Sequence, residues 1–240
     1  MGFELLNGNY LGNNLFIKNI QRKSNASEWN PLYGECNIYK DLYNETTICL
    51  ANRKTKQQKL RITFRAYNEG IAFRYTFLNT DSCVITKETT KFALTRPAIA
   101  WVSQMAQDEI YKIPVEQIEN TCERPLLIEY DSSTYLALGE AALVDFAPMK
   151  LEKFKPDINT LITALTDSVI MQDEFVSPWR FIMVAENPAQ LLENNYFILN
   201  LNEPDKLTDI SWIKPGKVIR ETTLTTNGGI ACIDFAKKYN

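Results

Sequence analysis

Histidine does not occur in the 240 residues of this chain, and this restricts the chemistry that its side chains can perform. Without an imidazole there is no Ser-His-Asp triad, no usual general base and no histidine ligand for zinc. Any chemistry must therefore use carboxylates, lysine, tyrosine or a bound hard cation.

The cysteines do not replace the missing histidines as a metal or redox site. The chain has five cysteines, an odd number, and none of them form a C-x-x-C pair. This disfavours a zinc site or a disulfide framework. We expect buried, unpaired thiols instead. The five cysteines are Cys36, Cys49, Cys83, Cys122 and Cys232.

Glu140 is the sharpest candidate among the acidic residues. In the strand predicted over Thr134–Glu140, alternation places its carboxylate on the same side as Leu136 and Leu138. A carboxylate on an apolar face is costly unless a cation or hydrogen-bond donors meet it. Calcium prefers such hard oxygens. The alternative is that the strand ends at Gly139, so that Glu140 points into water.

No pair of acidic residues stands out as an acid/base couple. Glycoside hydrolysis, for example, needs two carboxyl groups placed across the scissile bond. The chain has 29 acidic residues, but no spacing singles out two of them. We therefore predict no catalytic residue from the sequence.

The net charge of −3 argues against a nucleic-acid partner, which would require a basic surface. No apolar run has the length needed to span a bilayer, so no membrane partner is expected. The segment 1–14 shows no charged region followed by an apolar one, so no signal peptide is visible.

Alternating apolar residues predict that most of the chain is β-structure. Leu60, Ile62 and Phe64 share one face, and the run from Ile71 to Phe77 alternates in the same way. The turn chemistry of 67–70 joins the two runs into a hairpin. Many strands separated by turn signals predict a sandwich. Further strands are expected over Thr46–Leu50, Pro125–Tyr130, Thr134–Glu140, Arg180–Ala185 and Tyr196–Asn202.

Helices are expected at two places near the C-terminal end. Asn187 and Pro188 predict a short helix through Glu193, because proline suits the first helical turn. Asn227–Tyr239 reads as an amphipathic helix, and Val218–Arg220 before it as a short strand. A strand followed by a helix is the opening of a βαβ unit.

Several phrases, in this order, resemble glycoside hydrolase family 97, and together they cover nearly the whole chain. The phrases are WNPLYGE (Trp29–Glu35), YNE (Tyr43–Glu45), FRAYNEGIAFRY (Phe64–Tyr75), YLALGEAALVDFAPMKL (Tyr135–Leu151), SPWRFIMVAENPAQLLENNYFILNLNEP (Ser177–Pro204) and SWIKPGKVIRETTLTTNGGIACIDFAKKYN (Ser211–Asn240).

The resemblance implies a mainly β fold: an antiparallel β-super-sandwich over residues 1–210, followed by a linker and the strand–helix start of a (β/α)8 barrel over 211–240. It implies the N-terminal, non-catalytic domain of an α-glucosidase or α-galactosidase with calcium in its active site. Glu140, in GEAAL, then matches a calcium ligand. The α-linked oligosaccharide would be bound mainly by the barrel, whose catalytic carboxylates lie outside this chain.

Glu203, Trp212 and Lys214 flank the linker toward the barrel that the resemblance implies. One interpretation is that they line the rim of a sugar site, where aromatic rings cover apolar sugar faces. The other is that Trp212 is a buried staple between domains. Trp29, Trp101 and Trp179 are expected to be core aromatics.

Three hypotheses for function stay open. The first is the family 97 domain described above. The second is a free-standing carbohydrate-binding β-sandwich module, since sandwiches host many sugar binders. The third is a non-functional remnant of a broken reading frame. The family resemblance implies a periplasmic or secreted protein. Exposed apolar surface, including the stripe Ile230, Ile233 and Ala236, predicts self-association of the isolated chain.

Overall fold

A computed structural model of the chain describes residues 2–239 and divides them into two compact units. The first unit contains the residues up to Trp29 together with Tyr39–Glu203. The second contains Asn30–Ile38 and the residues from Pro204 onward. Each unit is described by itself.

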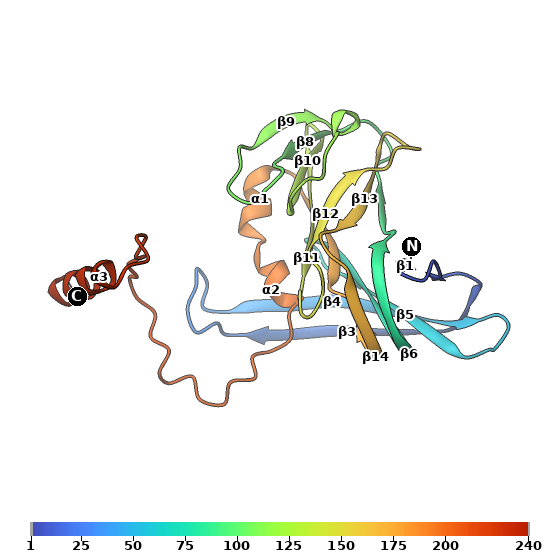
Figure 1. Ribbon diagram of the computed structural model, residues 1–240, viewed down its shortest axis with the longest axis horizontal. Helices are drawn as coiled ribbons and strands as arrows, with labels where there is room; N and C mark the ends of the chain where they lie inside the picture. Colours follow the sequence, from blue (N-terminus) through green and yellow to red (C-terminus); the bar gives the residue numbers. More distant parts are fainter. Residues whose placement is uncertain (1, 240) are drawn as a thin grey trace. The chain divides into compact units, whose positions relative to one another are not determined.

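One large antiparallel sheet forms most of the first unit (Figure 1). Its strands hydrogen-bond in the order β3-β4-β5-β6-β15-β11-β10-β8-β9, and β1 and β14 also pair with β6. The strands are β1 (Phe3–Leu5), β2 (Tyr10–Leu11), β3 (Leu15–Trp29), β4 (Tyr39–Asn52), β5 (Gln58–Ala66), β6 (Gly70–Glu88), β8 (Ile99–Val102), β9 (Tyr111–Pro114), β10 (Leu126–Asp131), β11 (Thr134–Ala141), β14 (Val169–Val176) and β15 (Trp179–Ala185).

A smaller sheet completes the predicted sandwich. It has the order β12 (Met149–Lys153), β13 (Thr160–Leu165) and β7 (Lys91–Ala93). Leu151 and Leu161 of this sheet are buried in one hydrophobic cluster with Phe73 and Tyr75 of β6. The fold class expected from the sequence is thus confirmed, and burial of these alternating apolar faces is its main driving force.

The hairpin predicted around residues 67–70 is present as β5 and β6. Phe64 lies opposite Phe73, and Ile62 lies opposite Tyr75. The turn closes with a hydrogen bond from the backbone N–H of Tyr67 to the Gly70 carbonyl, 2.8 Å. Gly70 has φ 157°, and a Cβ there would come within 2.2 Å of a backbone oxygen, so the turn needs glycine.

Two short helices cover the opposite face of the large sheet. Helix α1 (Pro188–Glu193) begins at Asn187, whose side chain accepts the Gln190 N–H, as the sequence predicts. It is followed by α2 (Tyr196–Asn200). Both contact β11, and α1 also packs on β15 (Figure 1). The strand predicted over Tyr196–Asn202 is therefore wrong.

The reason for this error lies in the spacing of the buried residues. Phe197 and Leu201 are buried four positions apart, in a second hydrophobic cluster with Trp179, Phe181 and Met183. This is helical spacing, but the segment YFILNL begins with a short continuous apolar run, which is also typical of a buried strand. Tertiary burial decides the conformation here.

The second unit contains helix α3 (Thr226–Lys238), which matches the predicted helix to within one residue at each end. The Thr225 side chain caps it by accepting the Gly228 N–H at 3.0 Å. Val218–Arg220 forms no strand in the described chain, since a parallel strand needs a neighbour to pair with.

A short 3-10 helix, Val115–Gln117, occurs in the first unit. None of the helices in the described residues is long and apolar enough to cross a membrane.

Candidate functional site

Glu140 lies inside the first unit, and both of its carboxylate oxygens are bound. Its side chain is 4% exposed. Oε1 lies 2.6 Å from Arg124 Nε, and Oε2 accepts a hydrogen bond of 2.6 Å from Arg180 Nη1. The backbone N–H of Met149 also donates to both oxygens, at 3.2 and 3.3 Å. The inward direction predicted from alternation is correct, and the alternative of a solvated Glu140 is wrong.

Arg180 connects Glu140 to a second buried carboxylate. Its guanidinium donates to Glu88 Oε1 through Nε at 3.1 Å and to Glu88 Oε2 through Nη2 at 2.6 Å. Neither Arg180 nor Glu88 is exposed. The fork geometry of arginine suits this bidentate contact, and Nη1 remains free for Glu140.

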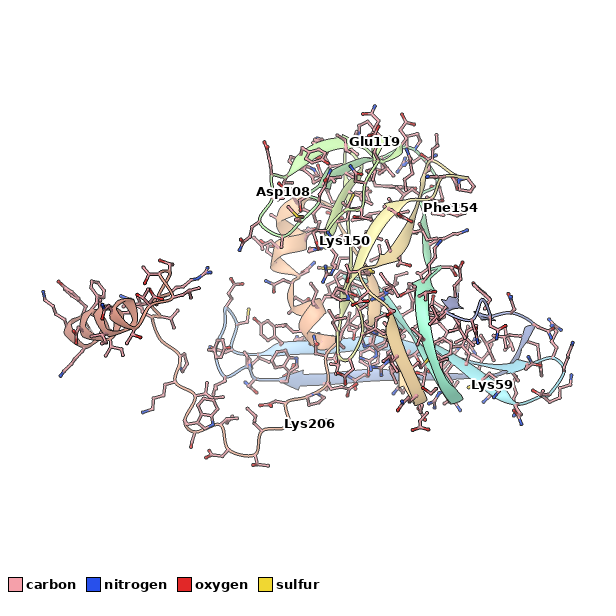
Figure 2. All side chains as sticks on the ribbon, viewed as in Figure 1. Lys59, Asp108, Glu119, Lys150, Phe154 and Lys206 are labelled. Atoms are coloured by element: carbon pink, nitrogen blue, oxygen red, sulfur yellow. The ribbon has the colours of Figure 1, made fainter. Side chains whose placement is uncertain are left out.

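The other end of the cluster reaches the surface of the first unit. Arg124 also donates to Glu123 Oε2 through Nη1, 2.7 Å. Glu123 Oε1 is paired with Lys150 Nζ at 2.9 Å, and Lys150 lies on β12 (Figure 2). We call Glu88, Arg180, Glu140, Arg124, Glu123 and Lys150 the buried ion cluster.

Local structure explains how Glu140 comes to this position. The Asp131 side chain accepts the Ser133 N–H at 2.9 Å, which forms the turn between β10 and β11. Strand β11 then places Glu140 opposite Arg180 of β15. After β11 the chain turns sharply, with positive φ at Ala142 and Asp145, and brings the N–H of Met149 back to the carboxylate.

The charges of the cluster act on one another strongly. Burial alone would lower the pKa of Arg180, but Glu88 and Glu140 outweigh it and the pKa is raised, so Arg180 stays charged. Burial alone would raise the pKa of Glu123, but Lys150 and Arg124 outweigh it and the pKa is lowered. Both groups are therefore ionised at neutral pH.

The donors around Glu140 do not fit a calcium ion held by this chain alone. Calcium takes six to eight oxygen ligands, whereas Glu140 faces guanidinium N–H groups. Among residues 2–239, no three or more His, Cys, Asp or Glu side chains converge to hold a metal. Calcium ligation with further ligands from a barrel stays a prediction.

Glu203 lies at the end of the first unit, in contact with Arg74. Its Oε1 is 3.5 Å from Arg74 Nη1, whose guanidinium stacks 4.4 Å from the centre of the Trp179 ring. Burial and the neighbouring Arg65 lower the pKa of Arg74. The structure thus ties Glu203 to Arg74 of the large sheet.

Trp212 and Lys214 lie in the second unit and are both exposed. Trp212 is 68% exposed, and its indole N–H donates to the Asp209 carbonyl at 3.0 Å. The structure therefore does not bring the three predicted sugar-binding residues together with Glu140 in one described unit. Both the rim and the staple interpretations of Trp212 stay predictions.

Sequence reasoning missed the arginines that hold Glu140. Arg180 stands in the apolar run WRFIMVA. A charged residue within an apolar strand indicates a buried partner of opposite charge, and the same reasoning applies to Glu140. Arg124 gave no such signal, because it lies in a loop. Of the three tryptophans expected in the core, Trp179 is buried, whereas Trp101 is 40% exposed.

Comparison with solved structures gives matches over the whole chain. A glycoside hydrolase family 97 enzyme from Pseudoalteromonas sp. strain K8, solved in complex with panose (E480Q) and with acarbose, is 28% identical with a TM-score of 0.86. The match covers 100% of this chain and 40% of that enzyme. The chain therefore spans well under half the length of these relatives.

A β-arabinopyranosidase structure shares the fold at lower similarity. It is 16% identical, with a TM-score of 0.65 over 78% of this chain and 34% of that one. The family model described as Glycosyl-hydrolase 97 N-terminal matches residues 1–204. This match spans the first unit and ends one residue after Glu203, so the chain belongs to the N-terminal domain family of glycoside hydrolase family 97.

Proposed function

We propose that this chain works as the non-catalytic N-terminal domain of a family 97 enzyme that hydrolyses α-glucosidic or α-galactosidic bonds. One observation carries the proposal: the whole chain superposes on 40% of an intact family 97 enzyme. That leaves the larger part of such an enzyme, where the sequence resemblance places the catalytic barrel, outside the matched residues. The domain packs on this barrel and supports its active site.

The ion pairs of the buried acidic residues support a non-catalytic role. Hydrolysis of a glycoside needs one carboxyl group to donate a proton and a second one to act as base or nucleophile. Glu45, Glu88 and Glu140 are all bound to arginine side chains. Each of their carboxylate oxygens contacts a basic side chain of the same unit.

The segment after α2 supports the docking role. Glu203 is tied to Arg74, and the Asn202 side chain accepts the Ala142 N–H at 3.2 Å. The domain therefore fixes the chain at the point where the linker begins. Trp212 and Lys214, exposed beyond this point, are free to contact the barrel or the rim of its sugar site.

Two preparations test the proposal: the 240-residue chain alone, and a longer product that includes any coding sequence downstream of Asn240. Both are assayed on nitrophenyl α-glucoside and nitrophenyl α-galactoside. We expect turnover from the longer product and none from the chain alone. Turnover by the pure chain, or a downstream sequence without alternating strands and helices, would contradict the proposal.

A free-standing carbohydrate-binding module is the second candidate, and one observation favours it. A hollow of about 470 Å³ includes Ile99, Glu129 and Tyr135 in its lining. Beside it, the exposed Trp101 donates its indole N–H to Glu129 at 3.0 Å. An exposed ring next to a carboxylate suits a sugar.

Calorimetry with maltose and panose separates the two candidates. The family 97 domain predicts no saturable binding by the isolated chain. Saturable binding that Trp101→Ala abolishes, while Trp212→Ala leaves it unchanged, would establish the module instead.

A further inference from the structure

Arg124 bridges two carboxylates in the way that a bound cation does. Its Nε lies 2.6 Å from Glu140 Oε1, and its Nη1 donates to Glu123 Oε2 at 2.7 Å. The Arg124 side chain is 24% exposed and that of Glu140 is 4% exposed, so Arg124 lies nearer to solvent than the carboxylate that it binds.

The positive charge around Glu140 is already complete. Arg180 holds its other oxygen from the buried side at 2.6 Å. In the buried ion cluster three carboxylates are balanced by two guanidinium groups and the Lys150 ammonium. A divalent cation added to a balanced cluster would be repelled by two guanidinium groups within contact distance of its ligand, and burial weakens the screening of that repulsion.

We infer that Arg124 takes the place of a metal ion at Glu140, so that this carboxylate works as the anion of an internal ion cluster and binds no calcium. The inference rests on the proposed function in one respect only, which is its consequence for an intact enzyme. An enzyme with this domain would keep its Glu140 region folded in the presence of chelators. The test of the inference does not involve the barrel, so either proposal can fail while the other holds.

Arg124→Ala removes the bridging cation and leaves Glu123 and Glu140 near each other without it. We expect this variant to become responsive to calcium. With a Kd on the order of 1 mM, typical of weak protein sites, about 10 mM calcium increases the folding equilibrium constant roughly tenfold. For a chain of this size, that raises Tm by about 3–6 °C.

The controls distinguish the loss of the positive charge at position 124 from a general loss of stability. The unchanged chain and Arg124→Lys, which keeps a cation at this position, are expected to show the same Tm in calcium and in chelator. Arg124→Ala combined with Glu140→Gln is expected to lose the response, because one of the two carboxylates is gone. If Arg124→Ala folds only in the presence of calcium, no Tm can be measured without the ion. A folded circular dichroism spectrum with calcium and an unfolded one without it then show the calcium dependence.

Two results would overturn the inference. One is a calcium-dependent rise of Tm in the unchanged chain that Glu140→Gln abolishes. The other is an Arg124→Ala variant whose folding is indifferent to calcium. In a longer product that includes the barrel, metal analysis provides a third readout: calcium bound in a 1:1 ratio and lost in Glu140→Gln would contradict the inference.

Discussion

Arg180 and Glu88 form a bidentate ion pair in which neither side chain is exposed to solvent. Glu88 is the last residue of β6, and Arg180 is the second residue of β15, so the pair fixes the junction of two central strands. Such a pair is weak evidence for stability as a whole, but breaking it leaves a buried charge without a partner.

Substitution of Arg180 is therefore expected to be among the most damaging single changes. Arg180→Met removes the bidentate partner of Glu88 and one of the two arginine partners of Glu140, and we expect it to lower the free energy of unfolding by about 3–5 kcal/mol. Urea unfolding followed by circular dichroism measures this. The control is Arg96→Met, which breaks an exposed ion pair with Asp131 and is expected to cost less than about 1 kcal/mol. Equal costs for the two variants would show that the buried cluster is dispensable.

The lowered pKa of Glu123 predicts a loss of stability in acid. The pKa of this group is below 4.5 in the folded chain, so the unfolded chain binds the proton more tightly. The stabilisation is complete above the unfolded pKa and disappears as the pH falls through the folded one. We expect Glu123→Gln to be less stable than the unchanged chain near neutral pH, and the difference to shrink below about pH 4. A difference that does not change with pH would contradict this.

Gly139 of β11 is expected not to tolerate a side chain. A Cβ at this position would lie 2.4 Å from the ring of Phe181, which is itself buried in the second hydrophobic cluster. Gly139→Ala should cost about 1–3 kcal/mol through overpacking. Gly229→Ala is the matched control, because nothing lies within 4 Å of a Cβ there and α3 would gain helix propensity. Thermal unfolding of both variants tests the comparison.

Phe197 is the residue on which the docking of α2 depends most. It is fully buried, with ring centres 5.0 Å from Tyr67 and 5.7 Å from Phe181. Phe197→Ala is expected to cost about 3–5 kcal/mol, whereas Leu199→Ala, on the exposed side of the same helix, should cost much less. Hydrogen exchange of the α2 amides would show whether the helix itself loosens, and unchanged exchange would rule out this role.

The predicted self-association can be tested on α3. Ile230, Ile233 and Phe235 are each more than half exposed. Exposed apolar side chains on one helix favour association at high concentration. We expect light scattering to detect oligomers, and Ile230→Ser with Ile233→Ser to reduce them. A monomer at every concentration would contradict the prediction.

Part of the large sheet was predictable, because several of its strands keep a simple period. Strand β3 was not predicted, because most of its side chains are exposed and its sequence shows no apolar alternation. The hairpin around Gly70 and the strands that contain Glu140 and Arg180 all follow apolar alternation bounded by turn residues. Helix α2 was not predictable in this way, because its five residues begin with a continuous apolar run that suits either a helix or a strand, and packing against Phe181 decides between them.

The inward direction of Glu140 could be predicted, but not the groups that meet it. Alternation within β11 is a local property, whereas Arg124 and Arg180 approach from other parts of the chain. Because burying a carboxylate is costly, a positive partner is expected. The sequence does not show whether that partner is a metal ion or an arginine. The sequence resemblance favoured calcium, and the geometry places guanidinium groups there.

Asn200 joins two parts of the first unit that are far apart in the sequence. Its Oδ1 accepts the indole N–H of Trp29 at 2.8 Å, and its Nδ2 donates to the Lys40 carbonyl at 2.8 Å, so it holds the end of β3 to the start of β4. Leu201–Glu203 follow directly and lead out of the domain. Mechanical tension on the linker would therefore reach the long β3–β4 hairpin through Asn200, after it has loaded the contacts of Glu203 with Arg74 and of Asn202 with Ala142.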